Sequence, residues 1–127
     1  RGHAAGDAVI RAVGDLCGRI QRGHDFAARI GGEEFTVLLP ETDLDGAAIV
    51  AERLRRELEI MPIPASGDSL YVTASLGVTE AGPETDNVET LLARADRALY
   101  DAKRSGRNRV TIEAPIQAAQ PDNDPRR

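Results

Sequence analysis

The chain has 127 residues, of which 41% are hydrophobic and 29% charged, and its formal net charge is −5 at pH 7. This composition predicts one globular domain with room for a single core and argues against a disordered chain. The acidic balance argues against a general nucleic-acid binder, although local positive charge can still hold a nucleotide. Cys17 is the only cysteine, so neither a disulfide framework nor a cysteine-based zinc site is expected.

The first part of the chain predicts a helix followed by a β-hairpin. Apolar residues recur at helical spacing over residues 3–21, and Cys17 falls on that apolar stripe, which predicts a buried thiol. Two alternating runs follow, at residues 26–30 and 35–39. The glycine pair between them supplies the positive φ angles that a tight turn needs, so the two runs are expected to pair as a hairpin.

A second helix and a second strand are predicted in the middle of the chain. Residues 40–43 offer a helix cap, and residues 44–59 carry the apolar spacing of a helix. Residues 61–68 are rich in proline and glycine and predict a connector. The run at 70–79 alternates and is rich in β-branched residues, which predicts a strand in which Gly77 allows close backbone packing.

The last predicted helix covers residues 88–105. Asp86 and Glu89 stand three positions apart, which is the spacing of a capping box at the helix start. Gly106 is placed to end the helix, because glycine readily adopts the left-handed conformation found after a helix C-terminus.

A short final strand is predicted at residues 109–113. Residues 114–127 hold three prolines and little apolar content, which predicts a disordered tail. The folded domain is therefore expected to span residues 1–113.

The hairpin tip is the most distinctive stretch of the chain. Gly31 and Gly32 leave the backbone bare, and Glu33 and Glu34 place two carboxylates directly after the turn. Such a tip can be a solvated acidic hairpin, since loops are mostly polar surface. It can also be a cation-and-phosphate site, because hard divalent cations take oxygen ligands and a glycine-rich turn lets a phosphate approach the backbone.

Four motifs resemble those of the GGDEF family, the diguanylate cyclases. Residues 31–35 read GGEEF and resemble the family signature with glutamate as its third residue. Residues 95–110 read ADRALYDAKRSGRNRV and resemble the family run ADxALYxAKxxGRNRV. Residues 2–7, GHAAGD, resemble the family stretch GHxxGD, and residues 22–25, RGHD, resemble its RxxD motif. The motifs occur in the family's order, so the resemblance covers residues 2–110.

The resemblance implies a fold and an activity. The fold would be of the α/β class, an α+β sandwich in which an antiparallel sheet is flanked by helices, as in the nucleotidyl cyclase or ferredoxin-like palm type. The activity would be the condensation of two GTP into cyclic di-GMP with release of pyrophosphate. Each domain would hold one GTP, so a homodimer is implied, with Mg²⁺ (or Mn²⁺) as the metal cofactor.

The resemblance also implies roles for residues of the substrate site. Glu33 and Glu34 would be the catalytic metal ligands, and Gly31 and Gly32 would contact the substrate. Asp7 would hydrogen-bond the guanine base; by itself it would be interpreted as an ordinary first-turn acid favoured by the helix dipole.

Two cations near the end of the last helix complete the implied substrate site. Lys103 and Arg107 would bind the triphosphate, and two cations four residues apart at a helix end can indeed neutralise phosphate charge. The alternative is that they only complement the helix dipole.

Product inhibition is implied at a second site. Arg22 and Asp25 would form the inhibitory cyclic di-GMP site, where a planar arginine can grip a phosphate or guanine. The alternative is a surface ion pair worth ~0–1 kcal/mol. Arg53 would be a secondary arginine of this site, but Arg55 and Arg56 beside it also fit a basic solvated helix face.

The chain departs from the family pattern at its start. Family domains begin with a strand and a helix that carry a metal-binding aspartate and a guanine-reading asparagine, and this chain opens after that segment. We therefore expect an N-terminally incomplete domain, whose activity in isolation is an open question. A non-catalytic cyclic di-GMP receptor is the alternative function, and a purely dimerising domain is a third.

The resemblance also predicts the setting of the domain. An upstream sensor or regulatory domain is expected in the full protein, with GTP and cyclic di-GMP as ligands and no nucleic-acid partner. The domain itself is expected in the cytoplasm, whether or not the parent protein is tethered to a membrane.

Overall fold

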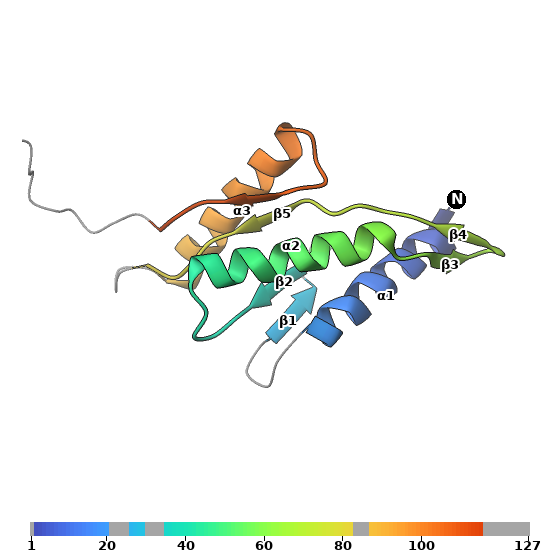
Figure 1. Cartoon of the computed structure of the whole chain (residues 1–127), viewed down its shortest axis with the longest axis horizontal. Helices are drawn as coiled ribbons and strands as arrows, with labels where there is room; N and C mark the ends of the chain where they lie inside the picture. Colours follow the sequence, from blue (N-terminus) through green and yellow to red (C-terminus); the bar gives the residue numbers. More distant parts are fainter. Residues whose placement is uncertain (1, 21–25, 30–34, 83–86, 116–127) are drawn as a thin grey trace, which may run out of the picture.

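The structure is a computed structural model (Figure 1) that describes residues 2–20, 26–29, 35–82 and 87–115. Three helices and six short strands follow one another in these residues. The helices are α1 (Gly2–Ile20), α2 (Leu44–Ile60) and α3 (Val88–Arg104). Each end of these helices lies within one residue of the prediction. The agreement is close because their apolar stripes are long and regular.

The six strands form three pairs. β1 (Phe26–Arg29) and β2 (Phe35–Leu38) are antiparallel, as the hairpin prediction required. β3 (Ile63–Ala65) and β4 (Asp68–Leu70) are also antiparallel. β5 (Leu76–Val78) and β6 (Val110–Ile112) are parallel and are connected through α3. The α+β class is confirmed, with two antiparallel pairs and one parallel pair among the described strands.

The β3–β4 hairpin corrects the prediction of a connector at residues 61–68. Ile63 and Ala65 alternate with exposed Pro64 and are themselves buried, so this short run does have a strand period. Ser66 and Gly67 both have positive φ, at 52° and 84°, which is the requirement of a two-residue hairpin turn. The prediction failed because a proline was taken to end regular structure, whereas strands of a small two-stranded sheet tolerate it.

The predicted strand at 70–79 is likewise interrupted. Leu70 ends β4, residues 76–78 form β5, and the residues between them are in no strand. The cap of α3 also differs from the prediction, because Asn87 rather than Asp86 starts the helix. The Asn87 side chain accepts from the Thr90 backbone N–H at 2.9 Å, and Thr90 Oγ1 accepts from the Asn87 backbone N–H at 2.9 Å.

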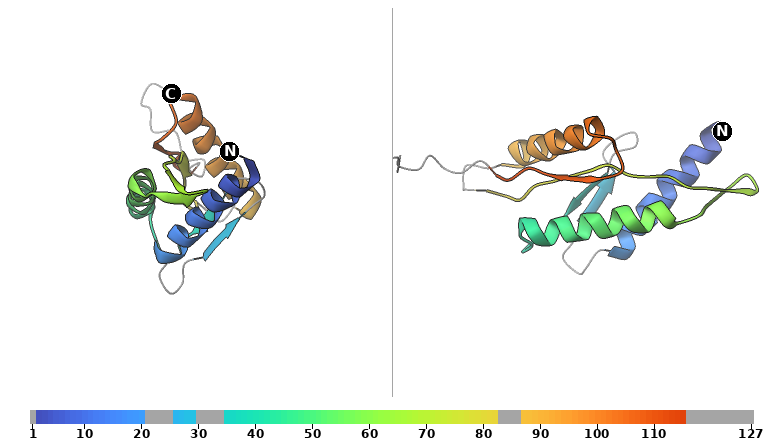
Figure 2. Two further views of the ribbon diagram at one scale, coloured as in Figure 1. Left: turned by 90° about the vertical axis from the view of Figure 1, so that its right-hand side faces the viewer. Right: turned by 45° about the horizontal axis from the view of Figure 1, so that its top comes forward.

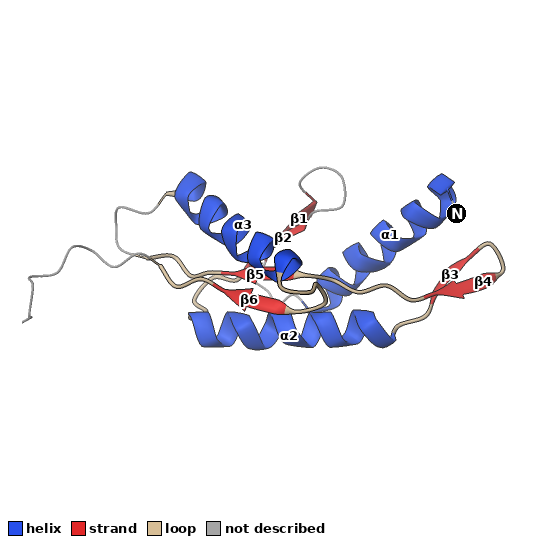
Figure 3. Cartoon of the chain, turned by 90° about the horizontal axis from the view of Figure 1, so that it is seen from above, coloured by secondary structure: helices blue, strands red, loops and turns tan. Residues whose placement is uncertain are grey.

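The parallel β5–β6 pair lies between α3 and α2, as Figure 2 and Figure 3 show from two directions. A Cβ atom on Gly77 of β5 would collide with the backbone of α3 at Ala95 O and Leu99 N. The absence of a side chain at this position therefore lets α3 pack directly on the strand. On α3, Ala98 and Ala102 are fully buried, and their small size allows the same close approach.

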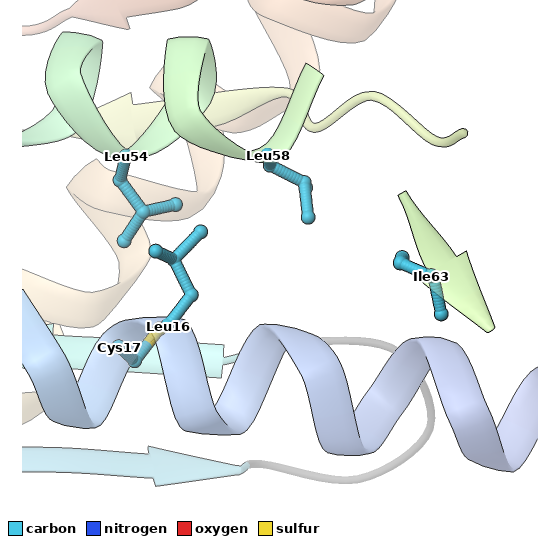
Figure 4. Packing of buried hydrophobic residues seen from close by; sticks show 5 residues of the cluster. All are labelled: Leu16, Cys17, Leu54, Leu58 and Ile63. Carbon is cyan, nitrogen blue, oxygen red and sulfur yellow. The ribbon is translucent and has the colours of Figure 1, made fainter. Parts of the chain in front are cut away.

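The core lies between α1, α2 and the β3–β4 hairpin. In Figure 4, Leu54 of α2 points toward Leu16 of α1, Leu58 points from α2 toward α1 beside it, and Ile63 lies beside the same space. Each such leucine, when fully buried, contributes about 1.5–3 kcal/mol from the removal of apolar surface from water. Cys17 belongs to this cluster, and its burial raises the pKa of its thiol above 9.0, as expected for a buried cysteine.

Candidate functional site

The β1–β2 hairpin leads to the predicted metal site. Arg29 pairs with Phe35 at the last described position, so residues 30–34 connect the two strands. This connection, with Gly31, Gly32, Glu33 and Glu34, lies outside the described residues. Arg22 and Asp25, which precede β1, also lie outside the described residues. Within the described ranges, no group of three or more His, Cys, Asp or Glu side chains is arranged to hold a metal ion.

The other predicted phosphate-binding residues lie at the C-terminus of α3. The helix ends at Ser105, whose N–H donates to Asp101 O at 2.9 Å, and Gly106 follows with a φ of 131°. The Arg107 N–H then reaches back to Ala102 O at 2.9 Å, which completes a Schellman-type helix end. The prediction that Gly106 ends the helix is confirmed. Residues 105–109 are called the α3 turn below.

The α3 turn has an uncommon backbone. Arg107 and Asn108 also have positive φ, at 62° and 46°. Asparagine tolerates this conformation, but for arginine the left-handed region costs roughly 1–2 kcal/mol. The conformation must therefore be held by contacts outside the turn.

The turn is joined to β5 and to the residue before it by hydrogen bonds of its backbone. The Asn108 N–H donates to Ser75 Oγ at 3.2 Å, and the Leu76 N–H donates to Arg109 O at 3.0 Å. The Arg109 side chain folds back on the turn, where its Nε donates to Arg107 O at 3.1 Å. These contacts carry the turn directly into the β5–β6 pair.

A third contact comes from α2 and was not predicted from the sequence. Arg55 Nη1 donates to Asn108 Oδ1 at 2.9 Å, and Asn108 Nδ2 donates to Glu59 Oε2 at 2.5 Å. Arg55 also holds both carboxylate oxygens of Glu52, at 2.8 and 2.7 Å. Its side chain is only 14% exposed, so a basic solvated face does not describe Arg55.

These contacts shift the titration of the groups involved. The hydrogen bonds from Arg55, with a smaller contribution from Arg56, lower the pKa of Glu52 from 4.5 to about 2. The same pairing with Glu52 raises the pKa of Arg55 further above its usual value. In the sequence, the only sign of this arrangement is the glutamates three positions before and four positions after Arg55.

The last turn of α3 and the α3 turn that follows it each present one uncommitted cation. Lys103 and Arg107 are exposed, and neither forms an ion pair or side-chain hydrogen bond within the part of the chain that the structure describes. By contrast, the Arg104 guanidinium lies over the Tyr100 ring, with Cζ at 5.6 Å from the centroid. Lys103 and Arg107 therefore keep their donors available for an anion, and the two side chains share one helix end.

An open hollow of about 280 Å³ lies at this end of α3. It is lined by Asp101, Arg104 and Ser105.

Asp7, the predicted guanine-binding residue, lies on α1. It is exposed and follows the first turn of that helix, so its interpretation as a first-turn acid no longer applies. Among the described elements, α1 packs on α2, β1 and β3 rather than on α3. The structure therefore does not bring Asp7 against Lys103 and Arg107.

Arg53 lies on the exposed face of α2. Its Nε stands 3.2 Å from Glu57 Oε1, while Arg56 Nε stands 3.1 Å from Glu52 Oε2. An exposed pair of this kind is worth about 0–1 kcal/mol, so an anionic ligand can displace it at small cost. A surface hollow of about 570 Å³ is lined by Ala48, Ile49, Glu52, Arg53, Arg56 and Glu57.

Comparison with known proteins identifies the family. The profile described as "Diguanylate cyclase, GGDEF domain" matches residues 1–109. Diguanylate cyclase A of Treponema denticola is 43% identical over 111 residues, which are 87% of this chain and 30% of that protein. The chain thus spans less than a third of the length of this curated relative.

Two solved structures are similar in fold as well as in sequence. One is the GGDEF domain of DgcB from Caulobacter crescentus in complex with c-di-GMP. Its TM-score is 0.82 at 38% identity, covering 87% of this chain and 66% of that one. The other is the active GGEEF domain of a diguanylate cyclase from Vibrio cholerae, with a TM-score of 0.75 at 32% identity, covering 87% and 70%. This chain belongs to the diguanylate cyclase GGDEF-domain family.

Proposed function

We propose that this chain is the GTP-binding and catalytic unit of a diguanylate cyclase. The supporting observation is that Lys103 in the last turn of α3 and Arg107 in the α3 turn are both exposed and unpaired within the described residues. A triphosphate offers several anionic oxygens, to which two uncommitted cations at one helix end can bind. The GGEEF stretch stands in the same chain, and the similar Vibrio cholerae domain with that signature is described as active.

The reaction joins two GTP molecules through two phosphodiester bonds. In each step, the 3′-oxygen of one GTP attacks the α-phosphorus of the other, its proton leaves to a base, and the bond to pyrophosphate breaks. Positioning and charge neutralisation dominate such phosphoryl transfers. Because each domain would hold one GTP, we propose that two copies face each other during catalysis.

The residues of this chain would divide these tasks. Lys103 and Arg107 would bind the β- and γ-phosphates and hold the α-phosphorus in line for attack. Asp7 would accept hydrogen bonds from the guanine edge, while Gly31 and Gly32 would allow the phosphates to approach the backbone.

Glu33 and Glu34 would hold Mg²⁺ or Mn²⁺. Two carboxylates are the oxygen donors that a hard divalent cation prefers, so the residue types fit the metal. When bound, the metal supplies charge neutralisation to the attacking and leaving oxygens.

We also propose that cyclic di-GMP inhibits the enzyme through Arg22, Asp25 and Arg53. Support comes from the hollow that contains Arg53 and from the c-di-GMP complex of the similar DgcB domain. Because the substrate is GTP, we place the domain in the cytoplasm. The upstream regulatory domain stays a prediction.

The activity is tested by incubating the natural full-length protein with GTP and Mg²⁺ and separating the products by chromatography. We expect the wild type to form cyclic di-GMP and pyrophosphate. Glu33→Ala should form these products at least a hundredfold more slowly, and Arg107→Ala should raise the KM for GTP at least tenfold. Arg104→Ala is the matched control, because Arg104 is a cation of the same helix end that lies over Tyr100; its KM should stay within twofold.

Unchanged turnover by Glu33→Ala would contradict the proposed catalysis. Absence of product together with cyclic di-GMP binding that Arg22→Ala removes would instead identify a receptor.

A further inference from the structure

We propose that Arg55 and Asn108 are positioning residues for phosphate binding, because Arg55 grips Asn108 from α2 and thereby fixes the turn that carries Arg107. The inference deepens the proposed function and rests on the assignment of Arg107 to the triphosphate. Neither Arg55 nor Asn108 would touch the substrate in this scheme.

The grip is a closed set of hydrogen bonds. Asn108 accepts from Arg55 Nη1 at 2.9 Å and donates to Glu59 Oε2 at 2.5 Å, so one amide side chain is held at both its oxygen and its nitrogen. Arg55 Nη1 stands 3.5 Å from Glu59 Oε1, which closes the ring.

The Arg55 guanidinium is itself held in place on α2 by Glu52. Its Nε and Nη2 hold the two oxygens of Glu52 in a bidentate pair at 2.8 and 2.7 Å. This pair leaves Nη1 pointing to Asn108 and fixes the plane of the guanidinium. The side chain is 14% exposed, so solvent screens the contact less than it screens the exposed pairs of Arg53 and Arg56.

Arg107, which precedes Asn108 in the α3 turn, needs the support of these contacts to keep its backbone conformation. Three successive residues, Gly106, Arg107 and Asn108, have positive φ. Without external contacts an arginine leaves this conformation, and its Cα–Cβ bond then points in another direction. The bond from the Arg107 N–H to Ala102 O holds one side of the residue, and the grip on Asn108 holds the other.

The grip therefore decides whether Lys103 and Arg107 meet the same ligand. Lys103 is set by α3 itself, whereas Arg107 is set by the turn. Two cations bind a polyphosphate together most tightly when the directions of both side chains are fixed before binding. A side chain that is not fixed must first be ordered, and this ordering costs free energy of binding. Loss of the grip should consequently weaken binding of the phosphates and leave binding of the base unchanged.

The test uses Asn108→Gly and Arg55→Met in the natural full-length protein, with the affinities for GTP and for guanosine measured by calorimetry. Glycine keeps the positive φ available at residue 108 and removes only the amide, while methionine keeps the stem of Arg55 without its donors. We expect each variant to bind GTP about tenfold more weakly and guanosine as the wild type does, which matches the loss of one hydrogen bond to a charged group.

A double-mutant cycle separates positioning from general destabilisation. Arg107→Ala alone should also weaken GTP binding, and Arg107→Ala combined with Asn108→Gly should be at most twofold weaker than Arg107→Ala alone, because both changes remove the same contact. Arg97→Met is the matched control. It breaks the paired bonds from Arg97 to Glu113 at 2.9 and 2.7 Å, which tie α3 to the residue after β6, and it should leave GTP affinity unchanged.

Wild-type GTP affinity in Asn108→Gly and Arg55→Met, with weak binding in Arg107→Ala, would overturn the positioning inference alone. Fully multiplicative effects in the double variant would overturn it as well, because they would indicate independent damage. If Arg107→Ala kept wild-type affinity, the phosphate assignment and the inference that rests on it would fall together.

Discussion

At Gly77, the backbones of α3 and β5 approach each other closely. An added Cβ would run into the α3 backbone at Ala95 O, Leu99 N and Ala98 C, and backbone cannot move aside as a flexible side chain can. We expect Gly77→Ala to lower the free energy of unfolding by about 3 kcal/mol or more, measured by chemical denaturation.

Gly18 provides the control for this substitution. It lies in α1 with nothing within 4 Å of an added Cβ, so Gly18→Ala should stabilise the protein by about 0.5–1 kcal/mol through helix propensity. Equal denaturation midpoints for Gly77→Ala and the wild type would contradict the packing described for β5 and α3.

At this scale, the sequence predicts residues whose role depends on their near neighbours. The burial of Cys17 follows from its place on an apolar stripe, and the helix-ending role of Gly106 follows from its place after the last apolar position. The grip of Arg55 on Asn108 joins residues 53 positions apart and depends on how α2 packs against the β5–β6 pair, which local patterns do not encode.

In α2, the pairing of Glu52 with Arg55 links stability to pH in the acid range. The pKa of Glu52 is lowered to about 2 in the folded protein by hydrogen bonds from Arg55, with a smaller contribution from Arg56, against 4.5 for the free group. A lowered folded-state pKa gives stability that is fully present above about pH 4.5 and is lost as the pH falls toward 2. Stability should therefore fall more steeply in this range for the wild type than for Glu52→Gln.

The measurement is the free energy of unfolding of both proteins from pH 6 to pH 2. The difference between them should be constant down to about pH 4.5 and then shrink. In an Arg55→Met background the same comparison should show a much smaller change, since the main cause of the lowered pKa is gone. A difference that stays constant to pH 2 would contradict the pairing.

The three helices were predictable from their long period, and the β1–β2 hairpin was predictable from its glycine turn, whereas β3 and β4 were not predicted. α1, α2 and α3 each repeat their apolar stripe over several turns, so their bounds were within one residue of the prediction. β3 and β4 have three residues each, too few to establish an alternating pattern, and Pro64 concealed the first of them. Their pairing depends on burial against α1, which is a tertiary effect.

For the whole molecule, Cys17 reports on global opening. The thiol is 4% exposed within the core between α1 and α2, and its pKa is raised by burial. A thiol reagent should therefore react only with the unfolded population. Leu58→Ala, which truncates a core side chain that is 1% exposed, should speed labelling on the order of a hundredfold, because such truncations cost about 2–5 kcal/mol.

Ile60→Ala is the matched control on the same helix, since Ile60 is 75% exposed and its loss should leave the labelling rate nearly unchanged. Labelling of the wild type at the rate of a free cysteine would contradict the described core.

The architecture as a whole could be predicted only through the family motifs. Periodicity supplies helices and strands, but the placement of the β5–β6 pair between α2 and α3 depends on small residues such as Gly77 and Ala98, whose partners are distant in sequence. The motifs also indicated that Lys103 and Arg107 act together. Their availability follows from the turn geometry, which the sequence alone does not reveal.

The parallel pairing of β5 with β6 constrains the order in which this domain can fold during its synthesis. β5 leaves the ribosome before β6, because the whole of α3 lies between them in the sequence. The hydrogen bonds from the Leu76 N–H to Arg109 O and from the Glu113 N–H to Val78 O can therefore form only after residues 109 and 113 have been synthesised. A ribosome paused within α3 would carry a nascent chain that has both core helices and no anchored α3 turn. The proposed nucleotide binding at Arg107 would require residue 113 to have cleared the exit tunnel, so the proposed cyclase activity would appear only late in the translation of the domain.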